Sequence, residues 1–183
     1  MLRLQLMFAT ALSAGAALSA DALPPAASAP PSPTAPTATA GTARLRPQSP
    51  RVAAWLARGR QRSATLRALA EQVERGDVVV YLEVAFRLDP RIAAQVIWLA
   101  SVPGVRYVRV SLRSDLRESD AIAMLAHELQ HVVEVIDSPE VQSGEDLAAL
   151  YARIGHRSGG GRTWDTVAAL RVGDLTRTEL RGA

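Results

Sequence analysis

Two of the chain's three histidines, His127 and His131, lie four residues apart, and Glu128 directly follows the first. On a helix this spacing places both imidazoles on one face, one turn apart, where they can bind one metal ion. Glu128 would lie about 100° round the helix, so its carboxylate can reach a metal-bound water without being a ligand. Zinc in such a site lowers the pKa of that water toward about 7, and the glutamate takes its proton as the water attacks a carbonyl. The spacing therefore indicates a zinc-dependent hydrolase with Glu128 as the general base.

The alternative is an ordinary solvated helix face that matches this pattern by accident. With 3 histidines in 183 residues, an accidental match is rare, and we interpret the pair as a metal site.

Two histidines and a water leave one position to fill, and four side chains are candidates for it. Glu134 lies one turn beyond His131, where it is better placed to orient an imidazole than to complete a tetrahedron. Asp137 has the spacing of the third ligand in metzincin peptidases, although this chain lacks the glycine that turns those chains. His156 lies in a glycine-rich segment and is a candidate ligand or oxyanion stabiliser. Asp165 is either the third ligand or a capping residue of the final helix.

The histidines belong to the strongest predicted helix of the chain, Ser119 to Ile136. Its apolar residues fall at helical intervals on one face, and His127, His131 and Glu134 lie on the opposite side. The helix is expected to pack its apolar face on a sheet and to present the histidines toward a cleft or solvent.

The remaining pattern predicts a small α+β domain. Helical spacing and caps predict helices at 63–76, at 144–155 and over most of 163–180, and alternation predicts strands at 77–89, 95–101 and 106–113. The last two strands are expected to form a hairpin, so an antiparallel or mixed sheet of about three strands packs against the histidine helix and further helices. Arg106, Arg109 and Arg113 are expected on a solvated face of the last strand.

The amino-terminal residues predict export. Residues 1–22 combine Arg3, an apolar stretch and small residues, as in a signal peptide cleaved after Ala20 or Ala22. The stretch is shorter than the roughly 20 residues that a membrane span needs, so no span is expected in the mature protein. Residues 23–50, rich in Pro, Ala, Ser and Thr, predict a disordered tether, and residues 51–183 predict the folded domain. The expected location is periplasmic or extracellular.

Composition narrows the chemistry further. The chain has no cysteine, which excludes disulfides and a lipid-modified cysteine. All its cations are arginines, its net charge is only +3, and aromatic residues make up 4%. Nucleic-acid binding is therefore not expected, because stacking residues are few and the chain is predicted to be exported.

The order of a sheet, a helix with HELQH, a second helix and an acidic residue before small residues resembles the gluzincin branch of zinc metallopeptidases. More narrowly, LAHELQHVVEV and WDTVAALRVGDLTRTEL resemble a group of small exported bacterial proteins of uncharacterised function, whose matching segments read HELQH and later phenylalanine-glutamate-threonine. The resemblance covers Val78 to Leu180. It marks His127, Glu128 and His131 as site residues, and it marks Asp165 as the third ligand where that group has glutamate.

These observations predict an exported, zinc-dependent metallopeptidase-like protein that hydrolyses peptide or amide bonds in a peptide or protein substrate. The strand from Tyr107 to Leu112 is expected to be an edge that aligns the substrate. Tyr151, His156 and Arg157 are candidates to stabilise the oxyanion. The alternative is a non-catalytic envelope domain that binds a partner and has a structural or vestigial metal site; the short domain and the aspartate at position 165 favour it.

Overall fold

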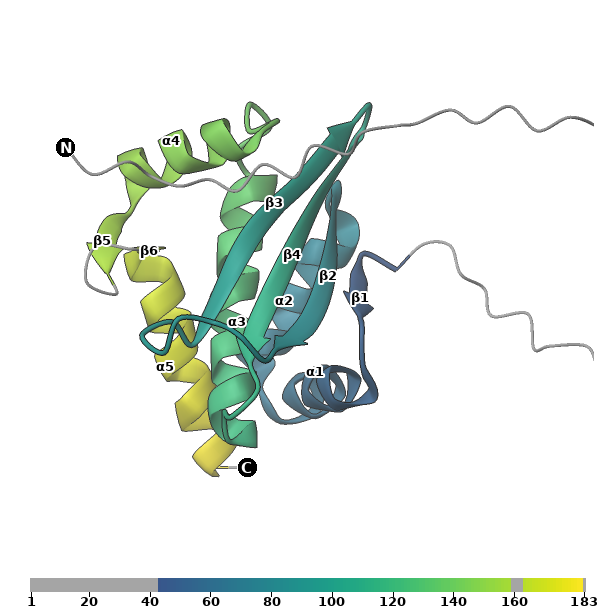
Figure 1. The fold of residues 1–183 in the computed structure, drawn as a ribbon. Helices are drawn as coiled ribbons and strands as arrows, with labels where there is room; N and C mark the ends of the chain where they lie inside the picture. Colours follow the sequence, from purple (N-terminus) through teal and green to yellow (C-terminus); the bar gives the residue numbers. More distant parts are fainter. Residues whose placement is uncertain (1–42, 159–162, 183) are drawn as a thin grey trace, which may run out of the picture. The chain divides into compact units, whose positions relative to one another are not determined.

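A four-stranded sheet and the helix that carries HELQH form the centre of the fold (Figure 1). The computed structural model describes residues 43–158 and 163–182, so the predicted signal peptide and most of the predicted tether lie outside the described residues. The elements are β1 (Leu45–Pro47), α1 (Pro50–Arg62), α2 (Ala64–Arg75), β2 (Val78–Ala85), β3 (Ala94–Val102), β4 (Val105–Arg113), α3 (Glu118–Ile136), α4 (Gly144–Ile154), β5 (His156–Ser158), β6 (Thr163–Asp165) and α5 (Val167–Gly182). The α+β class is confirmed.

The main sheet is mixed and has the strand order β1-β2-β4-β3. β1, β2 and β4 run parallel, whereas β3 and β4 form the predicted antiparallel hairpin around Gly104, whose φ of 77° favours glycine. β4 pairs with a strand on each side, so the prediction that Tyr107 to Leu112 is an edge strand is wrong. The edge on this side of the sheet is β3.

The fourth strand, β1, lies inside the segment that was predicted as tether. The Val80 amide donates to the Arg44 carbonyl and the Gln48 amide donates to the Leu82 carbonyl, each at 2.8 Å. Ser49 then caps α1, a helix that the sequence pattern did not predict. The predicted boundary at residue 51 is therefore too late: a strand of three residues in a proline-rich segment is too short to show alternation.

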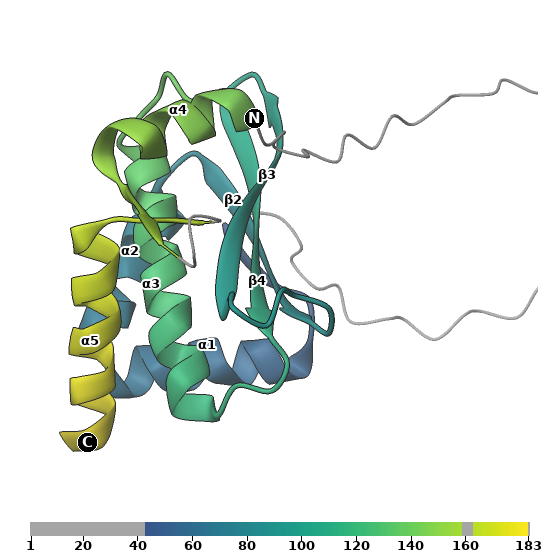
Figure 2. The ribbon, with the colours of Figure 1, turned by 60° about the vertical axis from the view of Figure 1, so that its left-hand side comes forward.

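Helix α3 lies between the sheet and α5 (Figure 2). Its apolar residues Ile122, Leu125, Leu129 and Val132 are fully buried in the core, as the helical pattern predicted. The histidine face is not open to solvent, because α5 packs along the same helix. Of the described helices, none is long and apolar enough to cross a membrane.

Arg106 corrects the prediction of a solvated arginine face. Its side chain shares the core face of β4 with Val108, and it is only 2% exposed. The guanidinium pairs with Asp77 at 2.7 Å and donates to the carbonyls of Val135 at 2.7 Å and Ser138 at 2.8 Å. Carbonyls at the end of a helix lack intrahelical donors, so this buried arginine caps the carboxyl end of α3.

The helix predicted over most of 163–180 is present as α5, which begins at Val167. Asp165, expected at the start of this helix, instead ends the short β5–β6 hairpin. The Ala169 amide donates to the Thr166 hydroxyl at 3.1 Å, so Thr166, and not Asp165, caps α5. Residues 159–162 of the glycine-rich segment lie outside the described part of the chain.

Candidate metal centre

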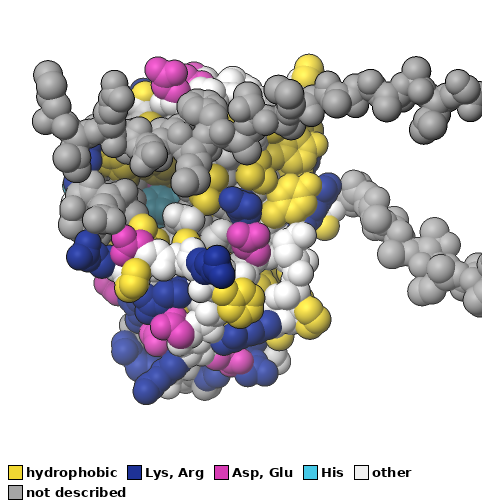
Figure 3. All heavy atoms as spheres, in the orientation of Figure 1, with side chains coloured by type: hydrophobic (Ala, Val, Ile, Leu, Met, Phe, Trp, Pro, Cys, Tyr) yellow, Lys and Arg dark blue, Asp and Glu magenta, His cyan; other side chains and the backbone are white. Residues whose placement is uncertain are grey.

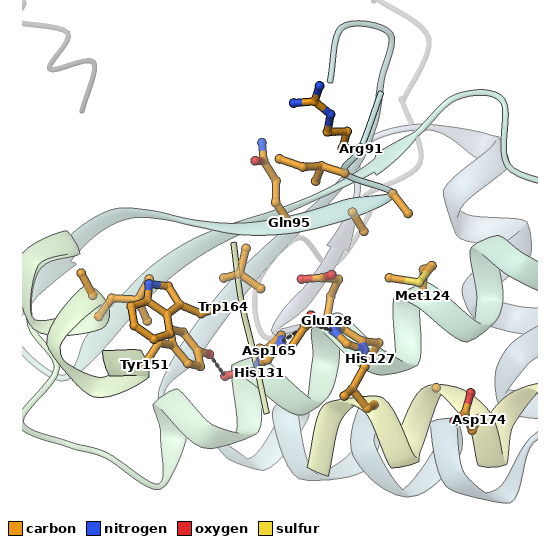
Figure 4. A pocket seen from close by; sticks show the side chains of 18 of the residues that line it. Arg91, Gln95, Met124, His127, Glu128, His131, Tyr151, Trp164, Asp165 and Asp174 are labelled. Atoms are coloured by element: carbon orange, nitrogen blue, oxygen red, sulfur yellow. Dashed lines mark hydrogen bonds and ion pairs between the residues drawn. The ribbon is translucent and has the colours of Figure 1, made fainter. Parts of the chain in front are cut away.

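His127, His131 and Asp165 direct possible ligand atoms toward a common point (Figure 4). These atoms all lie within 4.8 Å of one another. The Asp165 Oδ1 atom is 2.9 Å from Nε2 of His127 and 3.9 Å from Nε2 of His131. Ligand atoms bound to one tetrahedral zinc ion at about 2.0–2.1 Å lie about 3.3 Å apart, a value between these two distances. The buried group can therefore bind a metal ion with small side-chain shifts.

Three elements position this group. α3 places the two imidazoles on one face, with ring centroids 4.9 Å apart. Asp165 is the last residue of β6 and pairs with His156 across the hairpin. α5 begins directly after the hairpin and packs against α3, where a Cβ atom at Gly173 would be in van der Waals contact with the His127 side chain. The third candidate ligand thus reaches the histidines because the hairpin and α5 dock on α3.

Glu134 contacts the imidazole of His131 from the side away from Asp165. Its Oε2 atom is 2.8 Å from Nδ1 of His131, and its Oε1 atom accepts a hydrogen bond from the Thr166 hydroxyl at 2.5 Å. A carboxylate on Nδ1 favours the tautomer whose Nε2 lone pair is available to a metal. The expectation that Glu134 orients an imidazole fits this geometry, and its bond to Thr166 also ties α3 to the residue after Asp165.

Glu128 is 4% exposed and lines the same cleft. Figure 4 shows its carboxylate beside His127, on the side of α3 that faces β3. Burial raises the pKa of this carboxyl, while the positive charge of His131 and His127 acts in the opposite direction. A carboxyl whose pKa is raised from its ordinary value holds and releases a proton closer to neutral pH.

The electrostatics of the cluster favour a cation. Burial lowers the pKa of His131, but its interactions with the carboxylates of Asp165 and Glu134 outweigh burial and raise the pKa to about 9. The two carboxylates therefore stabilise positive charge at His131. A divalent metal ion bound in place of the proton would supply the positive charge that these carboxylates stabilise.

The ligand group lies in a cleft of about 460 Å³. The cleft is bordered by β3 with the loop before it, by α3, α4 and α5, and by β6. Figure 3 shows a histidine side chain recessed in this face, beside hydrophobic side chains. A cleft of this size is in the range that small ligands and peptide side chains occupy. The outer edge of β3 pairs with no strand among the described residues, and Ala94, Gln95 and Val96 of this strand line the cleft.

The other sequence candidates lie outside the ligand group. Asp137 is exposed at the carboxyl end of α3, and His156 is exposed on β5. The Tyr151 hydroxyl donates to the backbone carbonyl of His131 at 3.0 Å, so it holds α4 to α3. The Arg157 guanidinium lies 4.8 Å from the centre of the Trp164 ring. Trp164 and Thr166 were not predicted as site residues, although both are sequence neighbours of Asp165.

No protein-family model matches the chain, and no curated protein or solved structure matches it. The function must therefore be inferred from the geometry of the site.

Proposed function

We propose that this protein is an exported, zinc-dependent metallopeptidase-like hydrolase that cleaves peptide or amide bonds. The observation that carries the proposal is the convergence of His127, His131 and Asp165 in a cleft that also contains the buried carboxyl of Glu128. Two imidazoles and a carboxylate are a ligand set typical of catalytic zinc sites. When bound, zinc lowers the pKa of a coordinated water and polarises a carbonyl.

The chain's own residues supply the other requirements of hydrolysis. Glu128 accepts a proton from the attacking water and passes it to the leaving amine, a role that its raised pKa favours. Glu134 keeps the His131 imidazole oriented through Nδ1. The free edge of β3 can hold an extended substrate by strand addition, the role that was first predicted for residues 107–112.

The first experiment measures how many zinc ions each protein molecule binds. The full chain, stripped with a chelator and then given zinc, is expected to retain about one ion per molecule, as one group of three protein ligands implies. A chain that binds no zinc near this ratio would exclude the proposed mechanism.

The second experiment is the Glu128→Gln change, assayed on a mixed-peptide library. Removal of a general base is expected to lower the cleavage rate by about 10²–10⁴-fold while zinc content stays the same. Glu145→Gln, on the exposed first turn of α4, is the matched control and should cleave like the parent. Undiminished cleavage by Glu128→Gln would rule out the base role.

The competing function is a non-catalytic envelope domain. A parent chain that holds zinc but cleaves no member of the library would support it. Export is a separate part of the proposal: detection of the chain in the periplasmic fraction, shortened at Ala20 or Ala22, tests it.

A further inference from the structure

The cleft extends past the ligand group into an apolar half. Its walls there are Val96 from β3, Leu147, Ala148 and Tyr151 from α4, and Trp164 from β6. Leu147 and Tyr151 are 8% and 7% exposed, and Trp164 is half-buried. We call these five side chains the apolar subsite.

Two contacts fix the aromatic rings of the apolar subsite. Arg157 and Trp164 face each other across the β5–β6 hairpin, and the guanidinium lies 4.8 Å from the indole centre, which favours one ring orientation. The Tyr151 ring stands edge-on to the His131 ring, with centroids 5.1 Å apart, and its hydroxyl is bonded to the His131 carbonyl. The rings are therefore held in place before a ligand arrives.

The opposite half of the cleft also has charged side chains in its lining. Arg91 lies at its rim, and Asp174 and Arg177 form an ion pair at 2.9 Å beside Met124. Figure 4 shows Trp164 and Tyr151 on one side of the ligand group and Met124 and Asp174 on the other. A bound chain that crosses the ligand group would thus meet the two aromatic rings on one side and charged side chains beside Met124 on the other.

We propose that the apolar subsite binds a large apolar side chain, such as Leu or Phe, of the substrate residue next to the bond that is cleaved. The cleavage part of this inference rests on the proposed function. The Tyr151 ring, one wall of the subsite, lies 5.1 Å from the His131 ring, so the subsite adjoins the proposed metal ligands and would hold a side chain close to the reacting carbonyl. The substrate class is therefore peptides with a bulky apolar residue at the cleavage site.

Binding is tested first, without turnover. The zinc-loaded Glu128→Gln chain is titrated calorimetrically with blocked peptides that differ at one residue, which is Phe, Leu, Ala or Lys. The Phe and Leu peptides are expected to bind about 10–100-fold more tightly than the Ala peptide, the discrimination that an apolar pocket supplies. Equal affinities for the four peptides would overturn the inference.

A pair of variants on α4 locates the effect. Ala148 and Ala149 are both exposed, but only Ala148 lines the cleft. Ala148→Trp is expected to fill the subsite and remove the preference for Phe and Leu, with zinc content unchanged. Ala149→Trp adds the same side chain to the same helix and should keep the preference. A preference that survives Ala148→Trp would overturn the assignment to these residues.

The same peptides, given to the parent chain, separate the two proposals. Cleavage without an apolar preference would contradict the subsite and leave the hydrolase proposal intact. Preferential binding of Phe and Leu peptides without cleavage would support the subsite and contradict the hydrolase proposal.

Discussion

Helix α3 has a buried polar cluster at its carboxyl end and another at its middle, and the two differ in how their partners are arranged. At the end, the Arg106 guanidinium meets Asp77 and the carbonyls of Val135 and Ser138, all within 2.9 Å. At the middle, His127 and His131 meet the carboxylates of Asp165 and Glu134, with Glu128 alongside, and the group borders a cleft.

The difference shows which buried charge is structural. The Arg106 guanidinium is paired with the Asp77 carboxylate and donates to two backbone carbonyls, so the cluster is complete within the protein. The middle cluster has three carboxyl groups beside two imidazoles and an opening to the outside. An excess of converging acceptors is typical of a cation site, and charges that are merely buried do not indicate one.

The largest expected effect is on stability, from Arg106→Met. The change removes a buried guanidinium together with its bonds to Asp77 and to the carbonyls of Val135 and Ser138, and it should lower the free energy of unfolding by about 3–5 kcal/mol. Urea unfolding of the metal-free chain measures it. Arg109→Met is the control, because Arg109 is half-exposed and its Nε lies 3.5 Å from Glu83. Equal losses in the two variants would contradict the structural role of Arg106.

The next effect is on zinc affinity, from Asp165→Ala. Loss of one of three protein ligands should weaken zinc binding by about 100-fold or more. Asp137→Ala, which changes an exposed aspartate at the carboxyl end of α3, should bind zinc like the parent. A large loss only in Asp137→Ala, measured by competition with a chromophoric chelator, would move the third ligand to Asp137.

A smaller loss of zinc affinity is expected from Glu134→Ala. The carboxylate orients His131 and holds Thr166, so its removal should weaken zinc binding by about 10–100-fold. Glu134→Gln should recover part of the affinity, because the amide oxygen still accepts a hydrogen bond from Nδ1. If both variants lose only stability in the metal-free form and bind zinc normally, Glu134 does not position the ligand.

The smallest expected effect is on the pH dependence of folding stability, and it comes from a residue outside both clusters. Partial burial raises the pKa of Glu179, but hydrogen bonds from Ser63 and Thr65 outweigh it and lower the pKa below its ordinary value of 4.5. A lowered pKa stabilises the fold above pH 4.5, and this contribution is lost as the pH falls through the folded-state pKa.

Glu179→Gln should therefore flatten the acid side of the stability profile by less than about 1 kcal/mol. Thermal unfolding at a series of pH values below 5.5 measures this. Glu71→Gln, an exposed change on α2, should leave the profile unchanged; an unchanged profile for Glu179→Gln would contradict the role of its hydrogen bonds.

Local patterns predicted the parts of the fold that depend on neighbouring residues. The helical spacing of α3 and the turn at Gly104 are local signals, and both elements are where they were expected. β1 and the position of β4 inside the sheet depend on pairing between distant segments, which alternation within one strand cannot show. The burial of Arg106 was missed for the same reason, because its partners lie on other elements.

The residues of the candidate site also divide into those that local spacing predicted and those that it could not predict. His127, Glu128 and His131 were recognised from their spacing on one helix. Asp165 could not be chosen over other acids from the residues alone; its selection came from a resemblance, and the structure then brought it to the histidines. Trp164 gave no signal, because a tryptophan in a short hairpin lines a cleft only after α4 and α5 have docked.

The contact between His127 and Asp165 joins positions 38 residues apart. A metal ion bound by both would act as a cross-link in a chain that has no cysteine. A covalent cross-link around a loop of this length lowers the conformational entropy of the unfolded chain and so stabilises the fold by about 4 kcal/mol. A metal ion that joins the two residues would stabilise the fold by the same entropic effect. Metal content and resistance to unfolding should therefore rise and fall together.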